Sequence, residues 1–265
     1  MSELITGLSA AQIAALTTDQ IAGMTTEDVA AFTATQLRAL TTAQIQAITT
    51  ANIAAFSTAQ FPQFNTVQIA AMTAGQIAAI ETADLAAMTT AQIGAIEADD
   101  IGSLTTAQIV ALTTAQAGAL TSAQLAAMGT AQIQAMESQD FARLTSIAVT
   151  GLTTAQMEAL TTAQVSRLST AQVAALETAD VAALSTAGIR GLTTAQIVAM
   201  GSEQVGALTS AQVAVMSTAQ VRAIEVADVP ALSSDAVAGL TAAQIVALST
   251  AQAAALSTDQ VAALS

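Results

Sequence analysis

The chain has 265 residues, a formal net charge of −14 at pH 7, and neither Cys nor His. The missing residue types exclude disulfides, thiol nucleophiles, imidazole acid–base catalysis and the usual zinc sites. The acidic balance argues against binding to nucleic acid or to an anionic membrane surface. Large apolar residues never form a long run, so membrane insertion is not expected.

An eight-residue repeat runs through the chain without insertion or deletion, giving 33 octads followed by Ser265. Counted so that position 8 falls on residues 8, 16 and 24, position 8 is Leu, Met, Ile or Phe in every octad. Position 5 is a large apolar residue in 31 octads, position 1 is Ser or Thr in 24, and position 4 is Gln in 22. Unbroken phase predicts one solenoid domain over residues 1–265, and Ser265 suggests a piece of a longer array.

Each octad carries the signal for the start of a helix. In Thr153–Leu160, the pattern Thr-x-x-Gln is a capping box, and the apolar residues at positions 8 and 5 supply the accompanying hydrophobic staple. A continuous helix would drift by about 80° per octad and would leave every cap unused. We therefore expect an all-α solenoid of short helices over positions 2 to 7 or 8, with a corner near positions 8 and 1.

The placement of charges supports helices over a β-solenoid, which the Thr, Ile and Val content would otherwise allow. Of the 19 acidic residues, 18 lie at positions 1, 3 or 4, and all five arginines lie at positions 6 or 7. Acids in the first turn and cations in the last complement a helix dipole, whereas a strand has no comparable dipole.

Several octads depart from the consensus along the chain. Phe56, Phe61 and Phe64 surround Pro62, which we interpret as local repacking of the core, with an aromatic ligand patch as the alternative. Pro62 and Pro230 both occupy position 6, the last turn of a short helix, where a proline has little to break. Octad 145–152 is the most degenerate, yet it keeps the phase and marks no domain boundary.

Five octads combine Glu at position 1 with Asp at position 4. We interpret these pairs as alternative caps or as acids favoured by a helix N-terminus; the alternative is Ca²⁺ binding, because hard cations prefer oxygen ligands. Three of the pairs recur every 40 residues and would stack if five octads made one superhelical turn. The Ca²⁺ candidates are Glu81, Asp84, Glu97, Asp100, Glu137, Asp140, Glu177, Asp180, Glu225 and Asp228.

The pattern from Leu104 to Leu112, with Val110 in place of one Ala, resembles low-complexity octad arrays in large bacterial proteins, many of them exposed at the surface or secreted. The resemblance covers the whole chain. It implies a structural role at the cell surface or outside the cell, and it implies no catalytic residue and no cofactor. The N-terminal segment Met1–Ile5 shows no secretory signal.

The leading hypothesis is a non-enzymatic scaffold, such as a stalk, spacer, filament subunit or interaction surface, that associates with itself or with a protein partner. No constellation of nucleophile, base and stabiliser supports an enzyme. One alternative is a ligand-binding repeat surface, through the Ca²⁺ candidates or through Thr rows similar to those of ice-binding repeat proteins. Another is an acidic mimic of nucleic acid.

Overall fold

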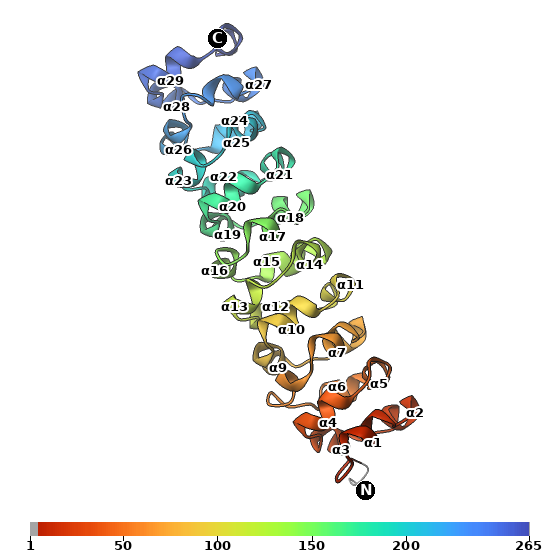
Figure 1. Cartoon of the computed structure of the whole chain (residues 1–265). Helices are drawn as coiled ribbons and strands as arrows, with labels where there is room; N and C mark the ends of the chain where they lie inside the picture. The colour runs from red at the N-terminus through yellow and green to blue at the C-terminus, as the bar shows by residue number, and fades with distance from the viewer. Residues whose placement is uncertain (1–4, 265) are drawn as a thin grey trace. The chain divides into compact units, whose positions relative to one another are not determined.

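The computed structural model describes residues 5–264 and shows one short helix for every octad from residue 9 onward (Figure 1). Met1–Leu4, which make up most of the N-terminal segment without a secretory signal, and Ser265 lie outside the described residues. Within residues 5–264 there are thirty α-helices of four to six residues, two 3₁₀-helices and no strand. The predicted all-α solenoid of short helices is confirmed.

The chain divides into two compact units, Met1–Ala135 and Met136–Ser265, and each is described by itself. The first contains α1 (Ala10–Ala14), α2 (Thr18–Ala22), α3 (Thr26–Ala30), α4 (Ala34–Ala39), α5 (Thr42–Ala47), α6 (Thr50–Ile53), η1 (Phe61–Gln63), α7 (Thr66–Ala70), α8 (Ala74–Ala78), α9 (Thr82–Ala87), α10 (Thr90–Ala95), α11 (Ala98–Ile101), α12 (Thr106–Ala111), α13 (Thr114–Ala117), α14 (Ser122–Ala127) and α15 (Thr130–Ala135).

The second unit has the same plan. It contains α16 (Ser138–Phe141), α17 (Ser146–Val149), α18 (Thr154–Ala159), α19 (Thr162–Arg167), α20 (Thr170–Ala175), α21 (Thr178–Ala183), α22 (Thr186–Gly191), α23 (Thr194–Val198), α24 (Ser202–Gly206), α25 (Ser210–Val215), α26 (Thr218–Ala223), η2 (Val229–Ala231), α27 (Ser234–Ala238), α28 (Ala242–Ala247), α29 (Thr250–Ala255) and α30 (Thr258–Ala262).

The corner between octads is made by two extended residues, as predicted. Leu40 ends α4 with φ −61° and ψ 132°, and Thr41 opens α5 with φ −77° and ψ 161°. Both conformations are open to any residue, so the corner needs no glycine. Gly7 has the only positive φ in the described part of the chain.

The two proline octads form 3₁₀-helices instead of the predicted α-helices. Pro62 and Pro230 have no N–H to donate to the carbonyl four residues earlier, so an α-helical turn cannot close there. Octad 145–152 keeps its helix, because Thr145 still accepts the Ala148 N–H at 3.0 Å. The unusual residues of this octad therefore do not interrupt the eight-residue repeat of helices.

The core of each unit is lined by positions 5 and 8. Ile45 and Ile48 are 0% and 2% exposed, respectively, and positions 5 and 8 are buried in every octad from residue 25 to residue 232. In the last octads they are partly exposed, and Val261 is 52% exposed. The phenylalanines around Pro62 are buried too, with the Phe56 and Phe64 ring centroids 5.2 Å apart in an edge-to-face contact. They repack the core locally, as predicted, and no aromatic patch is exposed there.

Helices three octads apart pack against one another within each unit, as α9 does on α12 and α19 on α22. Side-chain hydrogen bonds also join octads four apart, such as those from Gln196 to the carbonyls of Val165 and Leu168. One turn of the stack therefore takes between three and four octads. Five octads per turn, the condition under which three of the Glu/Asp pairs would stack, is not met. The sequence pattern does not encode the rotation at each corner. No described helix has the length and apolarity needed to cross a bilayer.

Gly191 lies where the backbones of two packed helices come close together. A Cβ added there would lie 2.6 Å from the Thr162 carbonyl oxygen, on the helix three octads earlier. We expect Gly191→Ala to lower the free energy of unfolding by about 1–3 kcal/mol through overpacking, exceeding the helix-propensity gain of about 0.5–1 kcal/mol. Urea unfolding followed by circular dichroism measures the change.

Gly201→Ser is the matched control. An added Cβ at Gly201 meets nothing within 4 Å, and a hydroxyl at this helix start replaces a glycine that serves nearly as well. Its effect should stay within a few tenths of a kcal/mol. Equal destabilisation by the two substitutions would contradict the close approach.

Candidate functional site

The predicted capping box is present in most octads. In α23, Gln196 N–H donates to the Thr193 hydroxyl at 3.2 Å, and Thr193 N–H donates to Gln196 Oε1 at 2.6 Å. Gly129 and Gly201 have no hydroxyl at position 1, but their backbone N–H groups still donate to the side chains of Gln132 and Gln204. The cap thus occupies the hydroxyl at position 1 and the amide oxygen at position 4.

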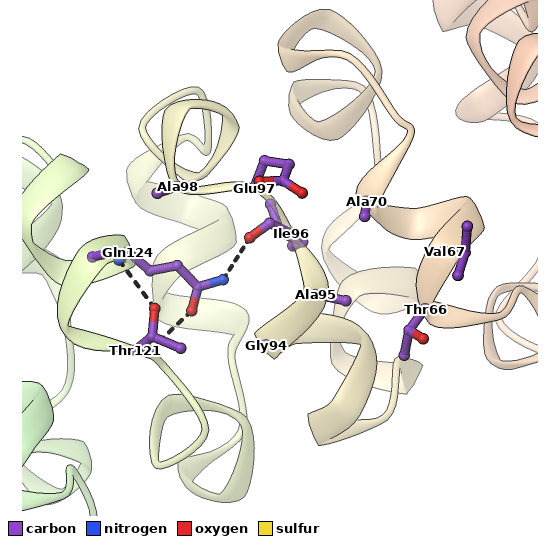
Figure 2. Close-up of a pocket in the computed structure, with 11 residues that line it drawn as sticks. Thr66, Val67, Ala70, Gly94, Ala95, Ile96, Glu97, Ala98, Thr121 and Gln124 are labelled. Carbon is purple, nitrogen blue, oxygen red and sulfur yellow. Dashed lines mark hydrogen bonds between the residues drawn. The ribbon is translucent and has the colours of Figure 1, made fainter.

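The amide nitrogen of the same Gln makes a second set of hydrogen bonds, which we call the glutamine ladder. Gln196 Nε2 donates to the carbonyls of Val165 and Leu168 at 2.8 and 2.7 Å, which are positions 5 and 8 of the octad four earlier. Figure 2 shows the same arrangement for Gln124, bonded to Thr121 and reaching the Ile96 carbonyl at 2.8 Å.

The ladder recurs through both units. The position-4 glutamines with at least one such bond are Gln36, Gln44, Gln60, Gln68, Gln76, Gln92, Gln108, Gln116, Gln124, Gln132, Gln164, Gln172, Gln196, Gln204, Gln212, Gln220, Gln244, Gln252 and Gln260.

Burial makes the ladder energetically important. Gln196 is 2% exposed, and a buried amide without partners costs about 1–3 kcal/mol. Its oxygen and nitrogen are both bonded, so burial is tolerated. The carbonyl of Leu168 lies at the corner, outside any helix, and the Gln196 amide is its donor. One side chain therefore caps its own helix and ties down the preceding turn.

The cap was predicted from sequence, and the amide's second role was not. One signal was available: position 4 never holds Glu, although Glu serves a capping box as well as Gln. A preference for Gln over Glu indicates that the amide N–H₂ is needed as a donor.

The ten acidic Ca²⁺ candidates divide into two environments. The five glutamates at position 1 are exposed, and Glu81, Glu97 and Glu137 accept no capping hydrogen bond, so the cap interpretation is wrong for these three. Four of the aspartates are buried and Asp100 is partly buried. The buried aspartates are Asp84, Asp140, Asp180 and Asp228.

Three of the five aspartates have a raised pKa. Burial, followed by the charge of Glu81, raises the pKa of Asp84. Burial raises the pKa of Asp180, and the Glu177 carboxylate adds to this, although the Glu177 N–H opposes it. Burial and the charges of Asp99 and Glu97 raise the pKa of Asp100. A hydrogen bond from the Ala74 backbone lowers it by a smaller amount. Each carboxyl therefore holds its proton more tightly than a solvated one.

The structure does not assemble the acids into a metal centre. Among residues 5–264, no group of three or more acidic side chains is placed to hold a metal ion. Glu137 and Glu177 are five octads apart, whereas adjacent turns bring together octads three or four apart. The stacking that motivated the Ca²⁺ hypothesis is therefore absent in this unit.

Two open grooves lie beside glutamates of these octads. One, of about 520 Å³, is lined by Val67, Gly94, Glu97 and Gln124 among others (Figure 2). The other, of about 780 Å³, includes Glu177 and Gly201. Both are bordered mainly by small residues. The first offers one carboxylate and the second offers two, Glu177 and Glu203, which is too little to define a substrate or a reaction.

A sequence model of the ALTTAQ repeat matches six segments of the chain, at residues 21–58, 77–114, 93–130, 133–170, 173–210 and 237–265. Together these segments cover well over half of the chain. No curated protein matches the chain.

Gln196→Glu tests the ladder while leaving a capping oxygen in place. The carboxylate can still accept the Thr193 N–H, but it has no donor for the carbonyls of Val165 and Leu168. We expect the free energy of unfolding at pH 7 to fall by about 2–4 kcal/mol, because two bonds are lost and a charge is buried. Urea unfolding measures this loss.

Gln12→Glu is the control. Gln12 is exposed and caps Ser9, but within residues 5–264 its amide nitrogen donates to no carbonyl. This substitution should change stability by less than about 0.5 kcal/mol. Similar losses from both variants would show that capping, and not the ladder, stabilises the stack.

Proposed function

Because the chain belongs to the ALTTAQ repeat family, we propose that it is a non-enzymatic structural scaffold, a stalk or spacer whose length is set by the number of octads. The observation that supports this proposal is the use of the repeated polar side chains. The hydroxyls at position 1 and the amides at position 4 are engaged in caps and in the glutamine ladder. The polar groups that recur from octad to octad therefore serve to hold the fold together.

The outer surface suits a spacer. Positions 1 to 3 are largely exposed and are mostly Thr, Ser and Ala, as in Thr153, Thr154 and Ala155. Such a surface has small side chains with scattered acidic ones, and it carries few groups able to act as nucleophile or base. Isolated apolar side chains interrupt it, with Ile147 75% and Val246 85% exposed, and these are candidate contacts for a protein partner or a second copy.

We further propose a location at a cell surface or in a secreted protein. The resemblance to octad arrays of large bacterial proteins supports this location, and the acidic, Lys-free composition is compatible with it. There, a stack of octads would hold other parts of an assembly apart. Its extension would follow octad number, because each added octad continues the same phase.

Deleting residues 41–72 tests the spacer. These are four whole octads of the first unit, so phase is retained while about one layer of the stack is removed. Spin labels on Thr18→Cys and Thr106→Cys are specific, because the chain has no other Cys. Pulsed electron paramagnetic resonance should show the distance between the labels shortened by about 8–10 Å, one helix-packing layer, with helix content per residue unchanged.

Deleting residues 41–44 alone is the matched comparison. Half an octad shifts positions 5 and 8 out of phase with the turns on either side, so we expect helix loss and a broad distance distribution. A scaffold defined by octad number is contradicted if the 32-residue deletion also loses its helices, or if the label distance does not change.

A further inference from the structure

A natural variation of the ladder occurs at Asn52. Its side chain is one methylene shorter than that of Gln, yet Nδ2 donates to the Met24 carbonyl at 2.9 Å, 28 residues earlier. Asn52 is 3% exposed. A side chain of this length at position 4 therefore reaches the position-8 carbonyl four octads earlier. Asp has the same shape as Asn but carries an oxygen where Asn carries the donor nitrogen.

Asp180 occupies this place in the second unit. Its Oδ2 accepts the Glu177 N–H at 3.1 Å, as Gln Oε1 does in other octads, which leaves Oδ1 on the side of the missing amide nitrogen. The carbonyl 28 residues earlier belongs to Leu152, and no donor to it is present within residues 5–264. An ionised Asp180 would direct a negative oxygen toward a carbonyl oxygen.

Asp84 repeats the situation in the first unit. It is 3% exposed, and α9 has no capping box, so the Asp84 carboxyl group does not accept the Glu81 N–H. Its counterpart carbonyl is that of Phe56, for which the described residues again supply no donor. Two octads in separate units thus bury an acid where the ladder requires an N–H.

We propose that Asp84 and Asp180 bind a proton in the folded array and, as carboxylic acids, donate to the carbonyls of Phe56 and Leu152, completing the ladder that Gln completes elsewhere. The proton comes from solvent, and no covalent bond changes. These octads are acid-stabilised joints, in which the contact between turns is strengthened by protonation and weakened by ionisation.

The charges around each acid favour the protonated form. The elements packed against α9 are α12 and η1, which carry no titratable side chain, so Glu81 is the one charged group beside Asp84. Around Asp180, α18 carries Glu158, α24 carries Glu203, and Glu177 lies on the same octad. All are acidic, so none stabilises a carboxylate. This also gives the Glu partner a role, because its charge raises the proton affinity of the Asp.

The direction of the pH effect follows from the raised pKa values of Asp84 and Asp180. Below the ordinary value of 3.8, both folded and unfolded chains hold these protons. As the pH rises, the unfolded chain releases them first, and the stabilisation is lost as the pH passes the higher folded pKa. The chain should therefore gain stability from Asp84 and Asp180 as the pH falls from neutral toward the ordinary value of 3.8.

The test compares the full chain with the double variant Asp84→Asn, Asp180→Asn from pH 8 down to the ordinary value of 3.8. Asn supplies the donor at every pH, so the urea midpoint of the variant should exceed that of the parent at pH 8, and the difference should shrink as the pH falls. Each unit by which a folded pKa is raised corresponds to about a tenfold change in the unfolding constant. The charge-matched control is Asp19→Asn, Asp235→Asn, in which two exposed acids are removed.

Carbon-13 NMR of the aspartate carboxyls provides a readout independent of stability. The Asp84, Asp100 and Asp180 resonances should titrate above the ordinary value, and those of Asp84 and Asp180 should disappear in the Asp84→Asn, Asp180→Asn variant while that of Asp100 remains. If every Asp titrates near its ordinary value, or if the control variant reproduces the midpoint shift, the proposal is overturned. It is also overturned if CaCl₂, compared with EDTA, stabilises the parent at pH 7 but not the variant, because a cation then fills the place of the proton.

Discussion

The hydrogen bonds from a position-4 amide to two backbone carbonyls four octads earlier hold the array together. Gln76 is representative, with Nε2 at 2.7 Å from the carbonyl oxygens of both Ile45 and Ile48. Apolar burial at positions 5 and 8 drives the stacking, but it is not directional. The amide fixes the register, because a shift by one residue would leave a buried donor and two carbonyls without partners.

This constraint explains why the repeat tolerates substitution but no insertion. Position 1 can be Gly, position 5 can be Ala and position 6 can be Pro while the turn is still tied down, as the bonds of Gln132, Gln116 and Gln92 show. Adding one residue would displace the amides of the next four octads from their carbonyls, because those bonds cross the insertion. The strict phase of the sequence is thus a consequence of bonds that span 28 and 31 residues.

Local features were predictable from the sequence, and features that depend on distant octads were not. Caps, the corner at positions 8 and 1, and the buried positions all follow from contacts within one octad. The number of octads per turn depends on small rotations at each corner, so the 40-residue spacing of Glu97, Glu137 and Glu177 was misleading. The 3₁₀-helix at Pro62 follows from a missing N–H, whose effect was underestimated in so short a helix.

The acidic octads show most clearly what the sequence alone does not reveal. Sequence alone paired Glu81 with Asp84, but it could not show that one is exposed and the other buried. Once the ladder is known, an Asp at position 4 is a carboxyl group in a place built for a donor. The same contact that makes the array a scaffold thereby makes certain joints of that scaffold sensitive to protons.

The most direct test of the glutamine ladder is NMR of the glutamine side-chain amides. For Gln196, the ladder predicts nuclear Overhauser effects from the Nε2 protons to Val165 and Leu168, and exchange with D₂O much slower than at the exposed Gln12 and Gln20. Contacts confined to the residue's own octad, with equal exchange rates at all three glutamines, would contradict it.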